Sequence, residues 1–209
     1  MDKIVVIGGG GHAKVLVSVL KKLAWDVVGY TDPEERGVIL GVPRLGDDAV
    51  LTDLLRTHGR CEAIIGLGQI DTSPQRALLL ERVEAMGFEV PVVVSPQAVV
   101  NDEVTLGPGT AVFDGAVVNS GTVTGRGCIV NTNSTLEHDC RLGDNVHVAS
   151  GSTVSGGVTI GNNCMIGAGA TVVQGVTICD DCLVGAGATV VRDIVVPGTY
   201  MGVPAERAR

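Results

Sequence analysis

Branched aliphatic residues recur at every sixth position through the second half of the chain. Counted from Val94, seventeen of eighteen successive positions carry Val, Leu or Ile, and Thr124 is the only departure. No helical period fits so strict a spacing, so the pattern predicts one short strand and one turn in each hexapeptide. The positions are Val94, Val100, Leu106, Val112, Val118, Thr124, Val130, Leu136, Leu142, Val148, Val154, Ile160, Ile166, Val172, Ile178, Val184, Val190 and Val196.

A second set of positions, four residues after each of the first, carries mostly small or aliphatic side chains. Because side chains alternate along a strand, we expect both sets to point into the interior of stacked coils. This set runs Ala98, Val104, Thr110, Ala116, Thr122, Cys128, Ser134, Cys140, Val146, Ser152, Val158, Cys164, Ala170, Val176, Cys182, Ala188, Ile194 and Tyr200. The residue directly after a first-set position is often Gly or Asn, which tolerate the positive φ that a sharp corner needs. These are Gly107, Asn119, Asn131, Gly143, Gly161, Gly167 and Gly185.

The first ninety residues follow a different pattern, in which hydrophobic strands alternate with apolar-periodic helices. This pattern predicts an α/β, Rossmann-like half domain over residues 1–90 and an all-β domain over residues 91–209. The expected strands are Lys3 to Ile7, Asp26 to Tyr30 and, third, Ala63 to Leu67; the expected helices run to about Leu23 and from Arg76 to Met86.

A glycine run joins the first strand to the first helix and suggests a phosphate site. Gly8, Gly10 and Ala13 satisfy the dinucleotide-binding spacing, and Asp32 stands near the position of the ribose-binding acid. Glycines let the backbone approach a phosphate, and a helix N-terminus offers free amides. An NAD enzyme is one interpretation, although only one half of a dinucleotide fold is present. The bland alternative is that the glycines only make a tight turn.

Composition narrows the class of protein. Aromatic residues make up 2% of the chain and hydrophobic residues 45%, which suits a narrow interior of small aliphatics. The net charge of −8 and the absence of a Lys or Arg run argue against nucleic acid as a partner. No signal peptide and no stretch of about 18 apolar residues occurs, so a membrane span is not expected and the predicted location is the cytoplasm.

The cysteines do not predict a metal site. Four of them, Cys128, Cys140, Cys164 and Cys182, fall in the inward second set and are expected to behave as small buried hydrophobes. Cys179 and Cys182 have the spacing of a zinc knuckle, but the second pair of ligands that a zinc site needs is missing.

The strongest candidate for a catalytic group lies in one corner of the repeat. Leu136 and Cys140 are expected to point inward, so Glu137, His138 and Asp139 should project outward. An imidazole beside a carboxylate suits a general base, because the carboxylate fixes the ring's tautomer. On these residues alone, an exposed corner with mixed charges is an equally good interpretation.

The hexapeptide run resembles the hexapeptide-repeat acyltransferases over residues 94–196, and Gly202-Val203-Pro204-Ala205 matches an ending common among them. The resemblance implies a left-handed parallel β-helix with three hexapeptides per turn. Gly10-Gly11-His12-Ala13-Lys14 after a first strand is similar to one branch of that family. This branch holds sialic acid O-acetyltransferases and N-acetyltransferases of UDP- or GDP-linked 4-amino-4,6-dideoxy sugars.

The resemblance also implies roles for individual residues. His138 would be the catalytic base and Asp139 the acid that polarises it. Acetyl-CoA would bind near His147, which alternation directs outward from a flat face. The resemblance places three further positions of small residues along acetyl-CoA, where ordinary turn chemistry is the alternative: Gly156, Ala168 and Ala186. The nucleotide-sugar would lie against Gly10, Gly11, His12, Asp32 and Gly68.

The predicted function is acetyl transfer from acetyl-CoA to the amine of a nucleotide-linked amino-deoxy sugar. A β-helix filled with side chains has no internal pocket, and the family forms homotrimers with active sites in the grooves between subunits. One alternative is a sugar O-acetyltransferase of the sialic acid type. A second is a non-catalytic trimeric assembly protein, against which the outward His138 corner argues.

Overall fold

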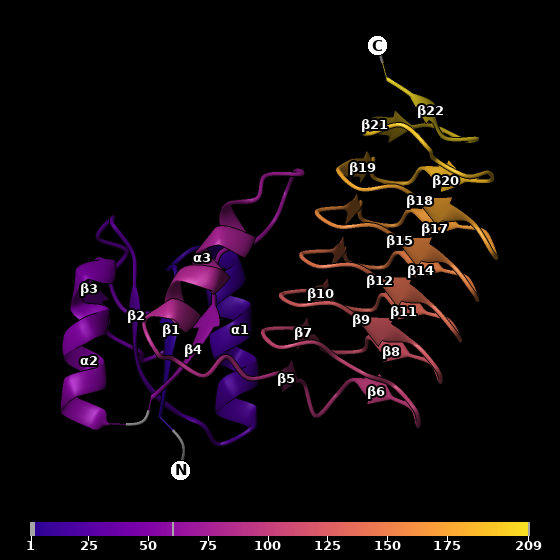
Figure 1. Cartoon of the computed structure of the whole chain (residues 1–209). Helices are drawn as coiled ribbons and strands as arrows, with labels where there is room; N and C mark the ends of the chain where they lie inside the picture. The colour runs from indigo at the N-terminus through magenta and orange to yellow at the C-terminus, as the bar shows by residue number, and fades with distance from the viewer. Residues whose placement is uncertain (1–2, 60, 209) are drawn as a thin grey trace.

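The N-terminal region is a parallel sheet flanked by helices, as seen in a computed structural model that describes residues 3–59 and 61–208 (Figure 1). The strand order is β3-β2-β1-β4. The strands are β1 (Lys3–Ile7), β2 (Asp26–Thr31), β3 (Arg44–Gly46) and β4 (Glu62–Ile65), and the helices are α1 (Gly11–Lys22), η1 (Asp48–Val50), α2 (Leu51–His58) and α3 (Gln75–Ala85). None of these helices is long and apolar enough to cross a membrane.

The predicted third strand, Ala63 to Leu67, is in fact the fourth along the chain and ends at Ile65. Sequence reasoning missed β3 because its three residues, Arg44 to Gly46, include no hydrophobic run. The strand is held by pairing to β2, which is a tertiary effect. Leu67 lies beyond β4, in the segment that joins β4 to α3.

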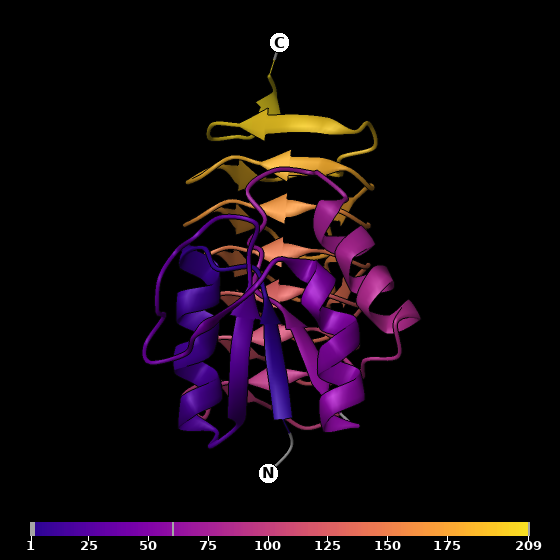
Figure 2. The same ribbon diagram turned by 90° about the vertical axis from the view of Figure 1, so that its left-hand side faces the viewer.

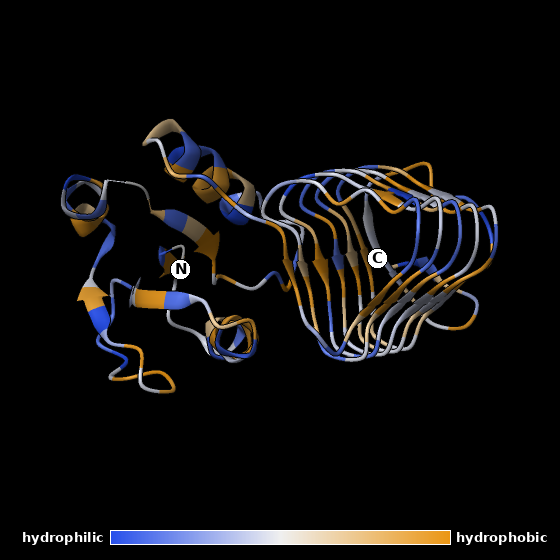
Figure 3. Cartoon of the chain, turned by 90° about the horizontal axis from the view of Figure 1, so that it is seen from below, coloured by the Kyte–Doolittle hydropathy of each residue, from blue (hydrophilic) through white to orange (hydrophobic). Residues whose placement is uncertain are grey.

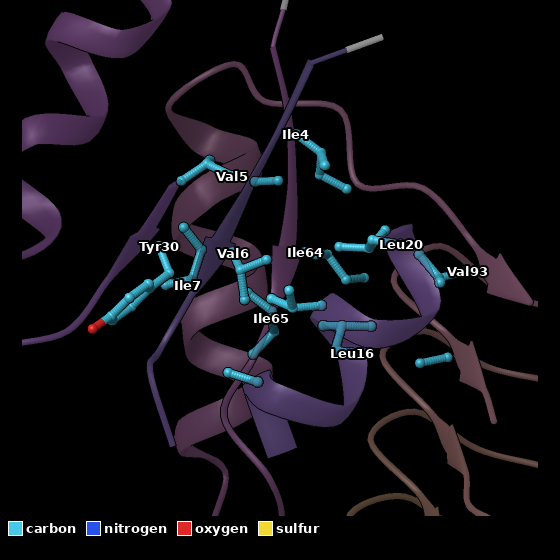
Figure 4. Close-up of a cluster of buried hydrophobic side chains, with 14 of the residues drawn as sticks. Ile4, Val5, Val6, Ile7, Leu16, Leu20, Tyr30, Ile64, Ile65 and Val93 are labelled. Carbon is cyan, nitrogen blue, oxygen red and sulfur yellow. The ribbon is translucent and has the colours of Figure 1, made fainter. Parts of the chain in front are cut away.

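The sheet is buried on both faces. All four residues from Ile4 to Ile7 are at most 1% exposed. They pack with Leu16 and Leu20 of α1 and with Ile64 and Ile65 of β4, and Figure 4 shows that the same cluster reaches Val93 of the first coil. A continuous apolar run is the pattern expected of a parallel strand covered on both sides.

The C-terminal region is a left-handed parallel β-helix with three flat faces. Strands pair in parallel with the strand 18 residues along, as Ile129 does with His147, so three hexapeptides make one coil. The last two strands depart from this rule, and Glu206–Arg207 pairs antiparallel with Gly198–Met201. The first face holds β5 (Val93–Val94), β7 (Ala111–Val112), β10 (Ile129–Val130), β13 (His147–Val148), β16 (Met165–Ile166), β19 (Cys182–Val184), β21 (Gly198–Met201) and β22 (Glu206–Arg207). The second face holds β6 (Val99–Val100), β8 (Val117–Val118), β11 (Thr135–Leu136), β14 (Thr153–Val154), β17 (Thr171–Val172) and β20 (Thr189–Val190). The third face holds β9 (Val123–Thr124), β12 (Arg141–Leu142), β15 (Thr159–Ile160) and β18 (Thr177–Ile178).

The interior contains the two predicted sets of side chains. From Val112 to Val190 every residue of the first set is at most 5% exposed, and from Thr110 to Ile194 so is every residue of the second set. The exceptions lie at the two ends, where Val100 is 37% and Val196 is 44% exposed. The prediction that these two are buried is wrong, because an end coil has a neighbour on one side only.

The corners correct a second prediction. The residue with positive φ is the third after each first-set position, as at Gly109, Gly127 and Asp139, and not the first. Gly107 and Gly167 directly follow such positions but have no positive φ. They lack side chains for another reason, since a Cβ there would lie 2.3 Å and 2.6 Å from the backbone of the next coil. Glycine at the first position therefore permits coil stacking.

The α/β region covers the lower part of the first face (Figures 1 and 2). Outward side chains of that face, Val93, Ala111 and Ile129, are at most 1% exposed and belong to the same apolar cluster as β1. Viewed from below, the corner between the second and third faces points away from the α/β region (Figure 3). We call this corner, with residues 137–140 and 155–158 in two successive coils, the far corner.

Candidate active site

A cavity of about 510 Å³ lies where β1 and β4 end and α1 begins. Its walls come from the glycine run, from Asp32 and from the segment between β4 and α3. Gly9 has to lack a side chain, because a Cβ there would lie 2.4 Å from the Tyr30 ring. Gly10 caps α1 without a side-chain hydrogen bond, and the first turn has no acidic residue. The positive end of α1 therefore remains available to a phosphate.

All the residues predicted to hold a nucleotide-sugar line this one cavity: Gly10, Gly11, His12, Asp32 and Gly68. They come from three separate parts of the chain, which the parallel sheet brings together. The cavity lies at the carboxyl ends of the strands, where ligands of open α/β sheets bind.

Asp32 holds the glycine run, residues 8–11, in place by a hydrogen bond to its backbone. Its carboxylate accepts hydrogen bonds from the amides of Gly9 (2.8 Å) and Glu34 (2.9 Å) and from Arg36 Nε (3.0 Å). Burial alone would raise the pKa of Asp32, but these hydrogen bonds outweigh it and hold the pKa below its ordinary value. Asp32 is therefore an ionised group at neutral pH, with most of its accepting capacity already used by the protein.

His12 forms the inner wall of the cavity, next to the β-helix. Its ring meets Phe113 edge-on at a centroid distance of 5.3 Å. A Cβ on Gly68 would lie 3.2 Å from the Cβ of His12, so this wall is tightly packed. Burial, with smaller contributions from Arg76 and His147, lowers the pKa of His12 to about 3. The imidazole is consequently neutral.

His147 leaves the coil as predicted, but it is covered rather than open to solvent. It is 7% exposed, because the segment after β4 lies over it. Its Nδ1 donates to the carbonyl oxygen of Gln69 at 2.7 Å, so its Nε2 accepts from Asn131 Nδ2 at 3.0 Å. Burial lowers the pKa of His147 to about 4, although the bond to Gln69 opposes this shift. This side chain joins the cavity wall to the first face.

Arg76 is a cavity residue that sequence reasoning missed. It is 2% exposed and donates to the carbonyl oxygens of Ile65 (3.0 Å), Leu67 (2.6 Å) and Gly127 (3.2 Å). Burial lowers its pKa to about 10, so the guanidinium remains charged at neutral pH. Arg36 and Gln69 also line the cavity and were also missed. Nothing in the local sequence distinguishes these polar residues from exposed ones.

The far corner holds the predicted base. His138 Nδ1 lies 2.9 Å from Asp139 Oδ2, and the two side chains are 57% and 73% exposed. Asp139 has a φ of 60°, which directs its short carboxylate back toward the ring. With Nδ1 donating to the carboxylate, Nε2 is left as a proton acceptor facing solvent.

Gly156 lies one coil away from His138 and directly against its ring. A Cβ on Gly156 would be 2.5 Å from His138 Nε2. Among the described residues, the Gly156 amide has no hydrogen-bond acceptor. Ala168 and Ala186 lie in successive coils of another corner, between the first and second faces. Within one chain the four predicted acetyl-CoA residues, which include His147, are therefore not brought together.

The arrangement separates two chemical parts. A proton acceptor stands on the far corner, and a cavity lined by a helix N-terminus lies on the opposite side of the β-helix. No group of three or more His, Cys, Asp or Glu that could hold a metal ion occurs within residues 3–59 and 61–208. Cys140, next to His138 in sequence, is fully buried, so it is not placed to act as a nucleophile.

Family models match three segments of the chain. The PglD N-terminal domain matches residues 3–77. A bacterial transferase hexapeptide model of six repeats matches residues 121–156, and the hexapeptide repeat of succinyl-transferase matches residues 157–192. A comparison with curated protein sequences gives no match.

Solved structures resemble the whole chain. A histidine-to-asparagine mutant of perosamine N-acetyltransferase from Caulobacter crescentus, in complex with CoA and GDP-perosamine, is 37% identical over 100% of this chain and 98% of its own, with a TM-score of 0.94. The acetyltransferase domain of PglB from Neisseria gonorrhoeae is 33% identical, covers 100% of both chains and has a TM-score of 0.93. WeeI from Acinetobacter baumannii is 25% identical over 99% of both chains, with a TM-score of 0.88.

Proposed function

The chain belongs to the hexapeptide-repeat acetyltransferases with a PglD-type N-terminal domain, and we propose that it acetylates the amine of a nucleotide-linked amino-deoxy sugar. The acetyl donor is acetyl-CoA, and the acceptor is a UDP- or GDP-linked 4-amino-4,6-dideoxyhexose. The observation that carries the chemistry is the His138–Asp139 pair, held with Gly156 on an exposed corner. The cognate ligands of the Caulobacter crescentus enzyme, CoA and GDP-perosamine, support the choice of substrates.

The nucleotide-sugar occupies the cavity at the ends of β1 and β4. Its diphosphate lies over Gly10 and Gly11, where the start of α1 supplies amides and a positive dipole. The nucleoside extends past Asp32 and Arg36 toward a second hollow of about 560 Å³ that shares Gly9 to Gly11 with the first. The sugar extends the other way, toward His12 and Gly68.

His138 acts as the general base. Its Nε2 takes a proton from the sugar amine as the nitrogen attacks the thioester carbonyl, and a C–N bond forms. Asp139 stabilises the imidazolium that results, because its carboxylate already accepts a hydrogen bond from the Nδ1–H group. The intermediate then collapses, the C–S bond breaks, and His138 returns the proton to the departing CoA sulfur. No covalent enzyme intermediate is needed.

The amide of Gly156 is placed to stabilise the oxyanion. It lies beside the imidazole, where the thioester carbon must come, and it has no acceptor among the described residues. A backbone donor aimed at the developing charge is worth on the order of a hundredfold in rate. The pantetheine arm runs along small residues, with Ala168 and Ala186 contributed by a neighbouring chain.

A complete active site requires two chains. His138 lies on the far corner, while the cavity belongs to the α/β region packed against the first face of the same chain. The base of one chain therefore serves the cavity of the next. A homotrimer, in which three identical grooves close a ring, satisfies this requirement.

The decisive experiment is an assay of CoA release with a panel of acceptors and the purified full chain. UDP- and GDP-linked 4-amino-4,6-dideoxyhexoses should support turnover, and His138→Ala should lower kcat by about 10²- to 10⁴-fold while acetyl-CoA binding is retained. Turnover with a sialic acid but no amino sugar would replace N-acetylation by O-acetylation. Near-normal turnover of the folded variant would refute the role of His138.

A further inference from the structure

The inner end of the cavity holds buried polar atoms that no described residue satisfies. They are both side-chain amide atoms of Gln69, Nε2 of His12 and Nη2 of Arg76. Gln69 is 4% and Arg76 is 2% exposed. These groups come from α1, from the segment after β4 and from α3, so no single local element explains them. A buried polar group without a partner is strongly destabilising, which implies that something else satisfies these atoms in the working enzyme.

The position of these atoms identifies which part of a ligand reaches them. Strands β2 and β4 flank β1 on opposite sides, so Gln69 and Arg76, which follow β4, line the cavity on the side opposite to Asp32, which follows β2. The glycine run that suits the diphosphate lies between the two ends. A nucleotide-sugar with its diphosphate over Gly10 therefore brings the hexose, and not the nucleoside, to Gln69.

The chemistry of the atoms selects the group that they bind. An amide offers both donors and an acceptor, and a guanidinium nitrogen offers a donor. A sugar hydroxyl both accepts and donates, so it can accept from Arg76 and donate to the amide oxygen of Gln69. We infer that Gln69 and Arg76, with His12 beside them, recognise a ring hydroxyl of the hexose and set the orientation of the sugar. This inference rests on the proposed function and names the part of the substrate that these side chains bind.

The charges around the cavity support one orientation of the sugar. Arg76 places a buried positive charge at the inner end and repels the protonated form of the sugar amine. Asp71 lies at the rim, with its side chain exposed, and attracts that form. The amine is therefore directed outward, to the side from which the His138 of a neighbouring chain can reach it.

Gln69→Met tests the inference, because it keeps an unbranched side chain of similar length and removes both hydrogen-bonding atoms. The backbone carbonyl of Gln69, which binds His147, is unaffected. The substrate is whichever of GDP-perosamine and a UDP-linked 4-amino-4,6-dideoxyhexose the wild type acetylates. We expect kcat/KM for that substrate to fall about 10- to 100-fold, mainly through KM. Binding of the bare nucleoside diphosphate, measured by calorimetry, and the KM for acetyl-CoA should change less than about twofold.

A substrate that lacks one ring hydroxyl supplies an independent arm that uses only the wild-type protein. With one such deoxy analogue, the kcat/KM of the wild type should fall as far as the kcat/KM of Gln69→Met falls with the full substrate. The kcat/KM of Gln69→Met should then be no lower with that analogue than with the full substrate. Gln97→Met, at an exposed glutamine outside the cavity, is the matched control.

Three outcomes would overturn the inference. These are an unchanged KM in the variant, an equal loss for the bare nucleoside diphosphate, and full activity of the wild type with every deoxy analogue. A wild type that acetylates none of the amino-sugar nucleotides would instead refute the proposed function itself.

Discussion

Replacing Gly156 by alanine places a methyl group against the imidazole of His138. The added Cβ would lie 2.5 Å from Nε2, 2.6 Å from Cε1 and 3.0 Å from Cδ2. Ordinary contact begins at 3.4 Å, so the ring has to move by 3.4 − 2.5, or 0.9 Å. Rotation of the ring away from the methyl group would break its hydrogen bond to Asp139, in which Nδ1 lies 2.9 Å from Oδ2.

The expected result is a loss of turnover without a loss of stability. A displacement of about 1 Å in a catalytic group lowers rate by about 10²-fold, so kcat should fall about 30- to 100-fold. Gly156 does not have a positive φ, and the same position of the far corner carries a side chain in other coils, as at Ser120 and Gln174. The backbone therefore accepts alanine, and the thermal unfolding midpoint should be unchanged or slightly higher.

The assay is the initial rate of CoA release at saturating acetyl-CoA and acceptor. The control is Gly156→Ala in a His138→Ala background, where no ring remains to be displaced. We expect the alanine at position 156 to cost nothing further there, since both changes act through one side chain. An undiminished kcat in the single variant would refute the reasoning. So would the same loss with and without His138, which would indicate blocked acetyl-CoA binding instead.

Three further predictions concern assembly, thiols and pH. The His138→Ala and Gly10→Trp variants should each be inactive alone, and mixing them should restore activity after subunit exchange. In a mixed assembly the intact His138 of the Gly10→Trp chain can meet the intact cavity of the His138→Ala chain. No recovery of activity would indicate that one chain supplies the whole site. Ellman's reagent should modify at most Cys179 in the folded protein and all six cysteines after denaturation, since the other five are buried. Burial lowers the pKa of His12 to about 3 and of His147 to about 4. Below about pH 6.5 the unfolded chain therefore binds protons that the folded chain excludes, and the free energy of unfolding should fall by about 1 kcal/mol per histidine between pH 6 and pH 5. His147→Gln should remove about half of that dependence in urea titrations.

The interior of the β-helix could be predicted because its physics is local and repeated. Each inward residue meets the same kind of neighbour 18 positions away in the coils before and after it. The requirement for a small or aliphatic side chain therefore recurs many times in the sequence. The prediction was wrong at Val100 and Val196 for the same reason, since the repetition stops at the ends. The corner glycines were misassigned because two glycine-rich positions serve different needs, positive φ at one and close coil stacking at the other.

The far corner was also predictable, because His138 and Asp139 stand in the corner between inward Leu136 and inward Cys140 and therefore project outward. The junction between the two regions was not. It depends on single contacts between distant residues, such as His147 with Gln69 and Arg76 with Gly127. No periodic pattern in the sequence predicts such contacts. One signal was available: the outward positions of the first face include Ala111 and Ile129, whereas those of the other two faces are all Thr, Val or Arg. An outward valine does not indicate a cover, because Val99 on the second face is 51% exposed.

The far corner was predictable and the junction was not, because different kinds of contact hold the two parts of the site rigid. The proposed base, His138, sits on a stack of coils whose hydrogen bonds hold it from both sides. The Asp139 amide donates to the carbonyl oxygen of Ser120, and the Gly157 amide donates to the carbonyl oxygen of His138. The cavity instead takes its inner wall from the contact of the two regions. Across that contact Arg76 donates to the carbonyl oxygen of Gly127, and His147 donates to the carbonyl oxygen of Gln69. A substitution at the junction should therefore alter acceptor binding, and one on the far corner should alter turnover. Under the proposed function, in which one chain supplies the base and another supplies the cavity, effects on KM and on kcat should separate in this way.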